Sequence, residues 1–165
     1  MQTDTLTTAD FITRAHRISG QVQTGNKPLS DLLNDRSQSY LLLFNVYISR
    51  LDKPGEIGDH APVAYLSKEN VSFVIVPARE VRLPDYGRFT SQKYELLAIL
   101  PGFEIRGIFT GPPRFDLRAF SPATLDSFIA VMDASAQIVS LPDVTFQGEA
   151  ILINRAQVES FCLQE

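Results

Sequence analysis

The chain has 165 residues and a mass of 18.4 kDa, enough for one ordinary domain or two very small ones. Apolar residues make up 44% and charged residues 21%, a composition typical of a packed globular protein, which excludes disordered, collagen-like and coiled-coil chains. The formal net charge of −4 gives no general attraction to phosphate backbones or anionic lipid. A nucleic-acid role would therefore need a local basic patch.

The sequence also predicts where the protein resides. Cys162 is the only cysteine, so the chain forms no internal disulfide and does not need an oxidising compartment. Residues 1–5 contain neither the basic nor the apolar region of a secretory signal. No apolar run approaches the roughly 20 residues that span a bilayer. We expect a cytoplasmic protein without membrane association.

The first half of the chain predicts one helical segment followed by short strands. Thr7 and Asp10 are spaced as in a capping box, which predicts a helical turn over residues 7–15. Ser30 is placed to cap a single turn that ends at Asn34. Alternating or continuous apolar patterns predict strands at residues 16–23, 40–49, 62–66 and 71–76.

A repeat follows from comparing the chain with itself. Four blocks recur in the same order at offsets of 85 to 88 residues: 17–22 with 104–109, 28–32 with 113–117, 40–46 with 128–134, and 63–71 with 150–158. Chance similarity between two β-rich stretches is the alternative explanation. The shared order and shared turn residues favour a duplicated unit.

The boundary between the two copies is predicted at the Pro- and Gly-containing segment 83–88. Residues 1–82 would form a first β-barrel unit that includes the N-terminal helical turn, and residues 83–165 a second unit that is a divergent repeat of it. The second unit would start with a strand at 93–100, and Ser121 with Pro122 would open a turn through Asp126. The first unit has net charge 0 (9 basic, 9 acidic) and the second −4 (6 basic, 10 acidic).

Several short motifs resemble the Sm-like family of small bent-sheet barrels. In the second copy, residues 105–108 with Phe115 and Asp116 resemble the first Sm motif, and residues 153–158 resemble the second. The matching positions of the first copy are residues 18–21, Asp31 and residues 67–71. The resemblance implies an all-β fold of two tandem small antiparallel barrels, Sm-like or SH3-like, with about five strands each and only short helical turns. It also implies RNA binding through loops. A looser similarity is to small bacterial β-proteins of unknown function.

Residues that could carry catalysis or bind a metal are scarce. The chain has two histidines and one cysteine, so no metal site and no Cys–His nucleophile are expected. Asp31 and Asp116 occupy matching turns, where an aspartate caps backbone amides. No phosphate-binding loop and no Gly-x-Ser-x-Gly motif occur. We expect neither enzymatic activity nor a cofactor.

Two groups of residues are candidates for binding. The possible anion- or RNA-binding group consists of basic side chains, partly interleaved with aromatics: Lys68, Arg106, Arg114, Arg118 and Arg155. Solvated turn charges are the alternative explanation for them. The possible interface group is aromatic: Tyr86, Phe115 and Phe120.

These features favour a non-enzymatic protein-interaction or scaffold module, which forms a homo-oligomer or binds a protein partner through edge strands and exposed aromatics. The alternative is RNA or single-stranded nucleic-acid binding through the Sm-like loops, which the acidic charge disfavours.

Overall fold

The computed structural model describes residues 5–83, 91–119 and 126–164. Its strands are β1 (Leu6–Ile12), β2 (His16–Gln23), β3 (Tyr40–Arg50), β4 (Asp59–Ser67), β5 (Phe73–Val76), β6 (Gln92–Leu100), β7 (Phe103–Gly111), β8 (Phe128–Ile138), β9 (Leu141–Asn154) and β10 (Ser160–Gln164). The helical elements are α1 (Leu29–Asn34) and the 3-10 turns η1 (Lys68–Asn70), η2 (Ala78–Glu80), η3 (Leu117–Ala119) and η4 (Arg155–Gln157). The all-β class is confirmed. Within the described ranges, no helix is long and apolar enough to cross a membrane.

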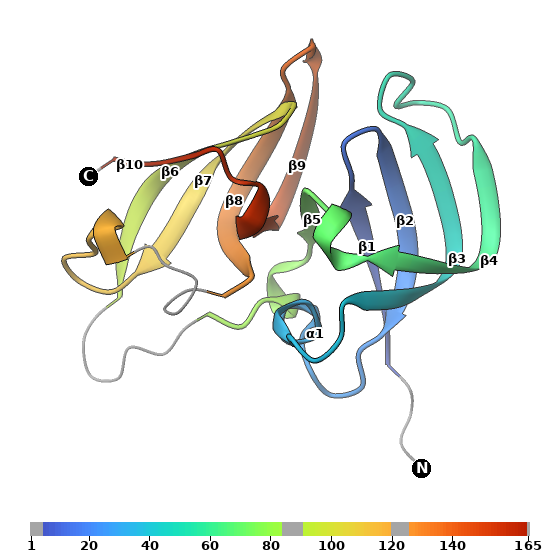
Figure 1. Cartoon of the computed structure of the whole chain (residues 1–165), viewed down its shortest axis with the longest axis horizontal. Helices are drawn as coiled ribbons and strands as arrows, with labels where there is room; N and C mark the ends of the chain where they lie inside the picture. Colours follow the sequence, from blue (N-terminus) through green and yellow to red (C-terminus); the bar gives the residue numbers. More distant parts are fainter. Residues whose placement is uncertain (1–4, 84–90, 120–125, 165) are drawn as a thin grey trace.

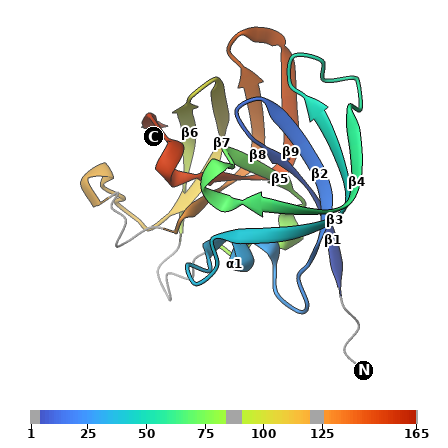
Figure 2. The same cartoon turned by 45° about the vertical axis from the view of Figure 1, so that its right-hand side comes forward.

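The ten strands form one antiparallel sheet that is not closed. Their order is β10-β6-β7-β8-β9-β5-β1-β2-β3-β4. Strand β5 lies at the centre and pairs with β1 on one side and β9 on the other, so it joins the two halves of the molecule (Figures 1 and 2). Strands β4 and β10 are the two edges of the sheet. Each pairs with a single neighbour in the part of the chain that the structure describes.

The two halves have the same internal strand order. Residues 6–76 are arranged as β5-β1-β2-β3-β4 and residues 92–164 as β10-β6-β7-β8-β9. Backbone hydrogen bonds also recur: Ser72 N donates to Ile12 O at 2.8 Å, and Glu159 N donates to Ile99 O at 2.7 Å. A register irregularity occurs at Gly20 in β2 and at Gly107 in β7. Strand β5 thus belongs to the first half, and the edge that does not pair with β1 pairs with β9 of the second half.

Most strands agree with the sequence patterns, while two helical predictions are wrong. Ser30 does not cap α1: it lies within the helix, whose N-cap residue is Pro28. The strands predicted at 16–23, 40–49, 62–66, 71–76 and 93–100 correspond to β2, β3, β4, β5 and β6. The predicted helical turn over 7–15 is wrong, because Leu6–Ile12 forms β1 and pairs with both β2 and β5. Thr7 and Ala9 are buried on one face of β1, so pairing on both edges outweighs the local capping pattern. Part of the turn predicted from Ser121 lies outside the described residues.

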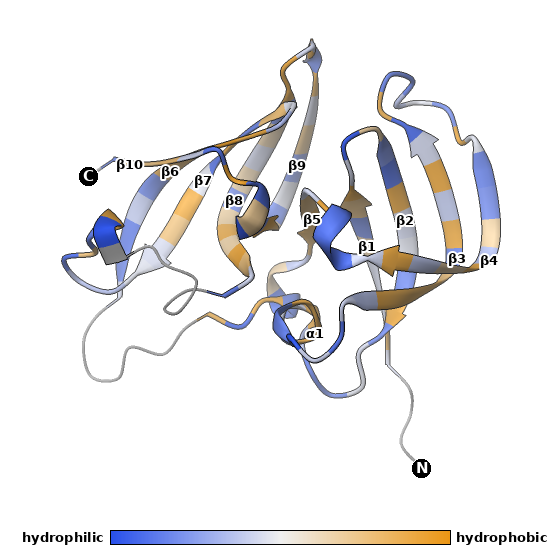
Figure 3. Cartoon of the chain, in the orientation of Figure 1, coloured by the Kyte–Doolittle hydropathy of each residue, from blue (hydrophilic) through white to orange (hydrophobic). Residues whose placement is uncertain are grey.

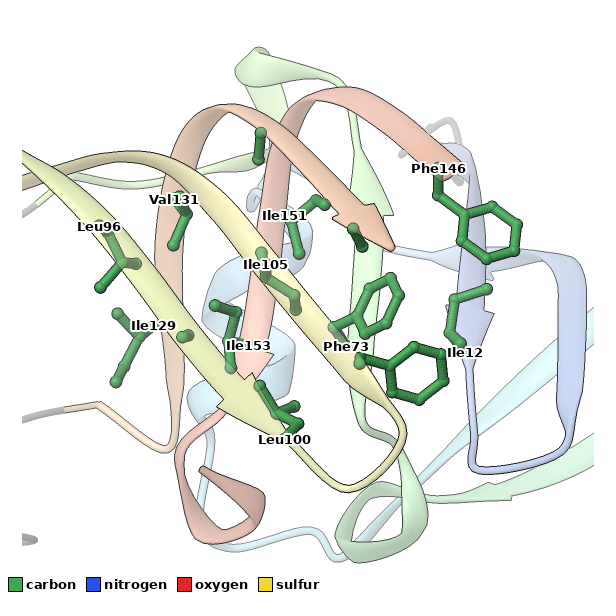
Figure 4. Packing of buried hydrophobic residues seen from close by; sticks show 14 of the residues in the cluster. Ile12, Phe73, Leu96, Leu100, Ile105, Ile129, Val131, Phe146, Ile151 and Ile153 are labelled. Carbon is green, nitrogen blue, oxygen red and sulfur yellow. The ribbon is translucent and has the colours of Figure 1, made fainter. Parts of the chain in front are cut away.

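The alternating strands bury two hydrophobic clusters, one in each half. Orange and blue bands alternate along the strands in Figure 3, as expected when one face of each strand is buried. The cluster of the second half packs residues of β6–β9, such as Ile105 and Ile151, against Phe73 of β5 and Ile12 of β1 (Figure 4). Phe73 meets Phe103 edge to face, with ring centroids 5.0 Å apart. Each half thus contributes to the core of the other.

Candidate interaction surface

An apolar surface covers the outside of the first half at its free edge. We call it the outer β3–β4 face; its residues are Tyr40, Leu42, Phe44, Val63 and Tyr65. Leu42 lies opposite Tyr65 and Phe44 opposite Val63 in the strand register, while the rings of Tyr40 and Tyr65 stack with centroids 4.9 Å apart. Tyr65 is 65% exposed and Val63 52% exposed. Leu42 is exposed as well, while Tyr40 and Phe44 are half-buried. Contiguous apolar side chains that remain accessible to solvent mark binding surfaces when the patch is large enough.

The matching surface of the second half is largely covered within the chain: three of its five residues are buried and two, Ala130 and Met132, are half-buried. The register of β8 with β9 repeats that of β3 with β4, since Ala130 lies opposite Leu152 and Met132 opposite Ala150. We call this the β8–β9 counterpart face; its residues are Phe128, Ala130, Met132, Ala150 and Leu152. Leu152 is 1% exposed, and the whole face belongs to or packs against the hydrophobic cluster of the first half.

The cover over the counterpart face comes from β5 and α1. Strand β5 pairs with β9, and its residues Val74 and Val76 lie in the same cluster as Leu152. Helix α1 adds Leu33 to this cluster, and its Asn34 Oδ1 accepts a hydrogen bond from Phe128 N at 2.8 Å. One half of the chain therefore shields the apolar face of the other through an edge strand and a short helix.

Helix α1 is held in place by buried polar contacts. Glu80 accepts hydrogen bonds from Leu29 N at 2.9 Å and from Thr7 Oγ1 at 3.1 Å, so a carboxylate satisfies the first turn of the helix. Arg82 donates to both carboxylate oxygens of Asp31, at 3.0 to 3.2 Å. Bidentate pairs of this kind add geometric specificity. The helix is thereby fixed against the segment that follows β5.

Lys68 fixes the other end of α1. Its Nζ donates to Leu32 O at 2.5 Å and to Asp35 O at 3.1 Å, and the residue is only 7% exposed. Burial lowers the pKa of this lysine, while the charge of Asp35 acts in the opposite direction. The Lys68 ammonium, predicted from the sequence as part of an anion site, is thus engaged with two backbone carbonyls.

The other basic candidates are distributed over several elements. Arg106 lies on β7, Arg114 follows β7, Arg118 is in η3 and Arg155 begins η4. Arg118 Nη2 pairs with Asp116 at 2.9 Å, which lowers the pKa of that carboxyl. Arg155 Nε donates to Asp126 O at 3.1 Å. An anion site at these residues stays a prediction.

Of the aromatic interface candidates, only Phe115 falls within the described residues; Tyr86 and Phe120 lie outside them. Phe115 is partly buried and packs on Phe109, with ring centroids 5.3 Å apart. Its backbone N–H donates to the hydroxyl of Tyr94 at 3.1 Å. The described aromatic candidate thus packs against the core of the second half, and its part in an interface stays a prediction.

The outer β3–β4 face was not predicted from the sequence, although one signal was present. Residues 40–44 are apolar at every position, whereas a strand with one solvent-facing side alternates. Such a run fits a strand buried on both faces. In the structure Leu41 and Leu43 are buried, while Leu42 is 46% exposed. One face of this apolar strand is therefore not covered by another element of the chain.

No metal-binding group of three or more His, Cys, Asp or Glu side chains occurs in the ranges that the structure describes. Comparisons with protein-family models, with curated proteins and with solved structures found no match for this chain.

Proposed function

We propose that this chain is a non-enzymatic protein-interaction module that self-associates through the outer β3–β4 face. The observation that carries this proposal is the difference between two matching surfaces: Leu152 is 1% exposed beneath β5 and α1, whereas Tyr65 at the matching position is 65% exposed. Burying an aromatic and several aliphatic side chains supplies the main free energy of most protein associations.

We further propose that each half is a small SH3-like or Sm-like unit, repeated in tandem and fused into one sheet through β5 and β9. The identical strand orders support this interpretation. So do the two 3-10 turns η1 and η4, which each precede the last strand of a half. The first residue of each turn also makes an equivalent backbone hydrogen bond: Lys68 N donates to Ser39 O and Arg155 N to Ser127 O, both at 2.9 Å.

The test is the mass of the purified protein by light scattering after size exclusion, with absorbance at 260 and 280 nm recorded across the peak. We expect wild type to exceed the single-chain mass of 18.4 kDa and Tyr65→Glu to elute as a single chain. A buried carboxylate without a partner opposes association strongly. Because Tyr65 is exposed within the chain, the variant should keep its fold and its circular dichroism spectrum.

The matched control is Thr145→Glu, at an exposed position of β9, which should leave the mass unchanged. A single-chain mass for wild type, or an oligomer that survives Tyr65→Glu, would overturn the proposal. A peak that carries nucleic acid and loses it in high salt would favour the RNA-binding alternative instead.

A further inference from the structure

We infer that the occupant of the outer β3–β4 face is the β10 edge of a second copy of this chain, paired antiparallel with β4. This inference rests on the proposed self-association and names the surface that the second copy contributes. Its template is within the molecule, where β9 and β5 already join one half to the other. The two free edges are the counterparts of these strands: β4 of the first half matches β9 of the second, and β10 of the second half matches β5 of the first.

The internal junction fixes the register that the second copy would adopt. In it, Ala150, Ile151, Leu152 and Ile153 of β9 lie opposite Val76, Ile75, Val74 and Phe73 of β5. The positions of β4 precede those of β9 by 87 residues, and the positions of β5 precede those of β10 by the same offset. The pairs across the new interface are therefore Val63 with Leu163, Ala64 with Cys162, Tyr65 with Phe161, and Leu66 with Ser160.

The side chains of this register suit an interface. Tyr65 would lie opposite Phe161, and Val63 opposite Leu163, so exposed apolar residues of β4 would join partly buried ones of β10. Cross-strand pairs of aromatic and aliphatic residues stabilise antiparallel sheets. Pro62, which has no N–H to donate, matches Glu149 and lies just outside the four pairs.

The second copy would also supply a counterpart of α1. The turn η3 follows β7 as α1 follows β2, and its Leu117 matches Leu32 in the repeated block. Leu117 is 44% exposed. An equivalent docking places η3 over Tyr40 and Leu42, as α1 lies over β8 in the internal junction. The apolar run at 40–44 would then be covered on both faces.

Such an interface is head to tail, because two different edges meet. Each added copy leaves one β4 edge and one β10 edge free, so the assembly is a closed ring or an extending filament. This differs from a symmetric dimer in which two β4 edges pair with each other, and the difference can be measured.

The decisive experiment is a disulfide cross-link in the predicted register. Opposed Cα atoms in an antiparallel pair are about 4.5 to 5.5 Å apart, a separation that a disulfide spans. Ala64→Cys, oxidised mildly, should form a bond with the native Cys162 of a second copy and give a ladder of covalent oligomers on a non-reducing gel. The ladder should vanish in Ala64→Cys with Cys162→Ser.

The matched control is Asp59→Cys, on the same strand and exposed, but five residues out of register. It should cross-link at least about tenfold less than Ala64→Cys, because five residues displace the thiol by roughly 17 Å. Equal cross-linking of the two variants, in a protein whose wild type is oligomeric, would overturn the β4–β10 register and leave the proposed self-association intact.

A mixing experiment tests the head-to-tail arrangement. Tyr65→Glu disables the β4 edge and Cys162→Glu the β10 edge, so each variant alone should be a single chain. Their mixture should give a species of twice 18.4 kDa, since one intact β4 and one intact β10 remain. If Cys162→Glu stays oligomeric while Tyr65→Glu does not, β10 is not the occupant; if both stay oligomeric, the proposed function fails as well.

Discussion

The outer β3–β4 face and its β8–β9 counterpart have the same strand register but differ in what covers them. Leu152 lies in a cluster shared with β5 and α1, whereas Tyr65 contacts Tyr40 and solvent. The side chains differ accordingly: the counterpart face has the small residues Ala130 and Ala150 where the outer β3–β4 face has Leu42 and Val63, and small side chains allow a neighbouring element to approach closely. The comparison indicates that burial here depends on a neighbouring half and that one of the two faces lacks such a neighbour.

The largest expected difference in unfolding free energy is between alanine substitutions at the matching positions 152 and 65 of the two faces. Leu152→Ala should lower the free energy of unfolding by about 2 to 5 kcal/mol, because it empties space in a closed core. Tyr65→Ala should stay within about 1 kcal/mol of wild type, because the side chain is mostly solvated. Urea unfolding at protein concentrations too low for association measures both. Equal losses would mean that the two faces are equally covered.

A second comparison concerns the glycines at the two register irregularities. A Cβ at Gly107 would lie 2.4 Å from Val131 Cγ1 and 2.8 Å from the carbonyl oxygen of Met132. At Gly20 the nearest atom would be Leu43 Cβ at 3.2 Å. Gly107→Ala should therefore cost about 1 to 3 kcal/mol, as overpacking does.

Gly20→Ala is the matched variant and should remain within about 1 kcal/mol of wild type, because only small movements of Leu43 are needed. Thermal unfolding of the two variants, followed by circular dichroism, measures the difference. An equal or reversed order of melting temperatures would contradict the expected tighter packing at β7.

The smallest expected effect is the pH dependence carried by Lys68, which matches Arg155 in the second half. Burial lowers the folded pKa of Lys68 below its ordinary value of 10.5. Between the folded pKa and 10.5 the unfolded chain binds more protons, so the free energy of unfolding rises with pH, by no more than about 1.4 kcal/mol per pH unit. Below the folded pKa the penalty of the buried charge is fully present.

Lys68→Met removes this titration, so the difference in unfolding free energy, wild type minus variant, should increase from neutral pH toward pH 10.5. Lys27→Met replaces an exposed lysine and should show a flat difference over the same range. Urea unfolding in a series of buffers measures both. A flat difference for Lys68→Met would mean that folding leaves the pKa of Lys68 unchanged, and a falling one that its carbonyl acceptors outweigh burial; either would contradict the expected lowering.

The sequence predicted most of the strands because their patterns are local. Alternation in His16–Gln23 and the apolar run that begins at Tyr40 hold wherever the strands are placed, and β6 begins within one residue of its predicted start. It failed at β1, where Thr7 and Asp10 have the spacing of a capping box. There the choice was made by pairing with β2 and β5, which are distant in sequence.

The candidate interaction surface could not be located in the same way. The sequence directed attention to Tyr86, Phe115 and Phe120 in the second half, of which the structure describes only Phe115, packed against Phe109 and Tyr94. The outer β3–β4 face, in the first half, was not among the predicted sites. The sequence shows that a side chain is apolar, but it does not show which neighbouring element, if any, buries it. Lys68 was likewise chosen for its charge alone, and only the structure shows that its ammonium donates to the carbonyls of Leu32 and Asp35 at the end of α1.

The sequence by itself determined the all-β class, the positions of most strands and the recurrence of blocks about 87 residues apart, since these depend on residues that are near each other or on direct comparison. Only the tertiary structure decided that β5 pairs with β9 across the two halves. That pairing buries Leu152 and leaves Tyr65 exposed. The physical reason is that the exposure of a side chain depends on whether another element packs against it. Strands with the same sequence pattern can therefore lie in the core or at the surface.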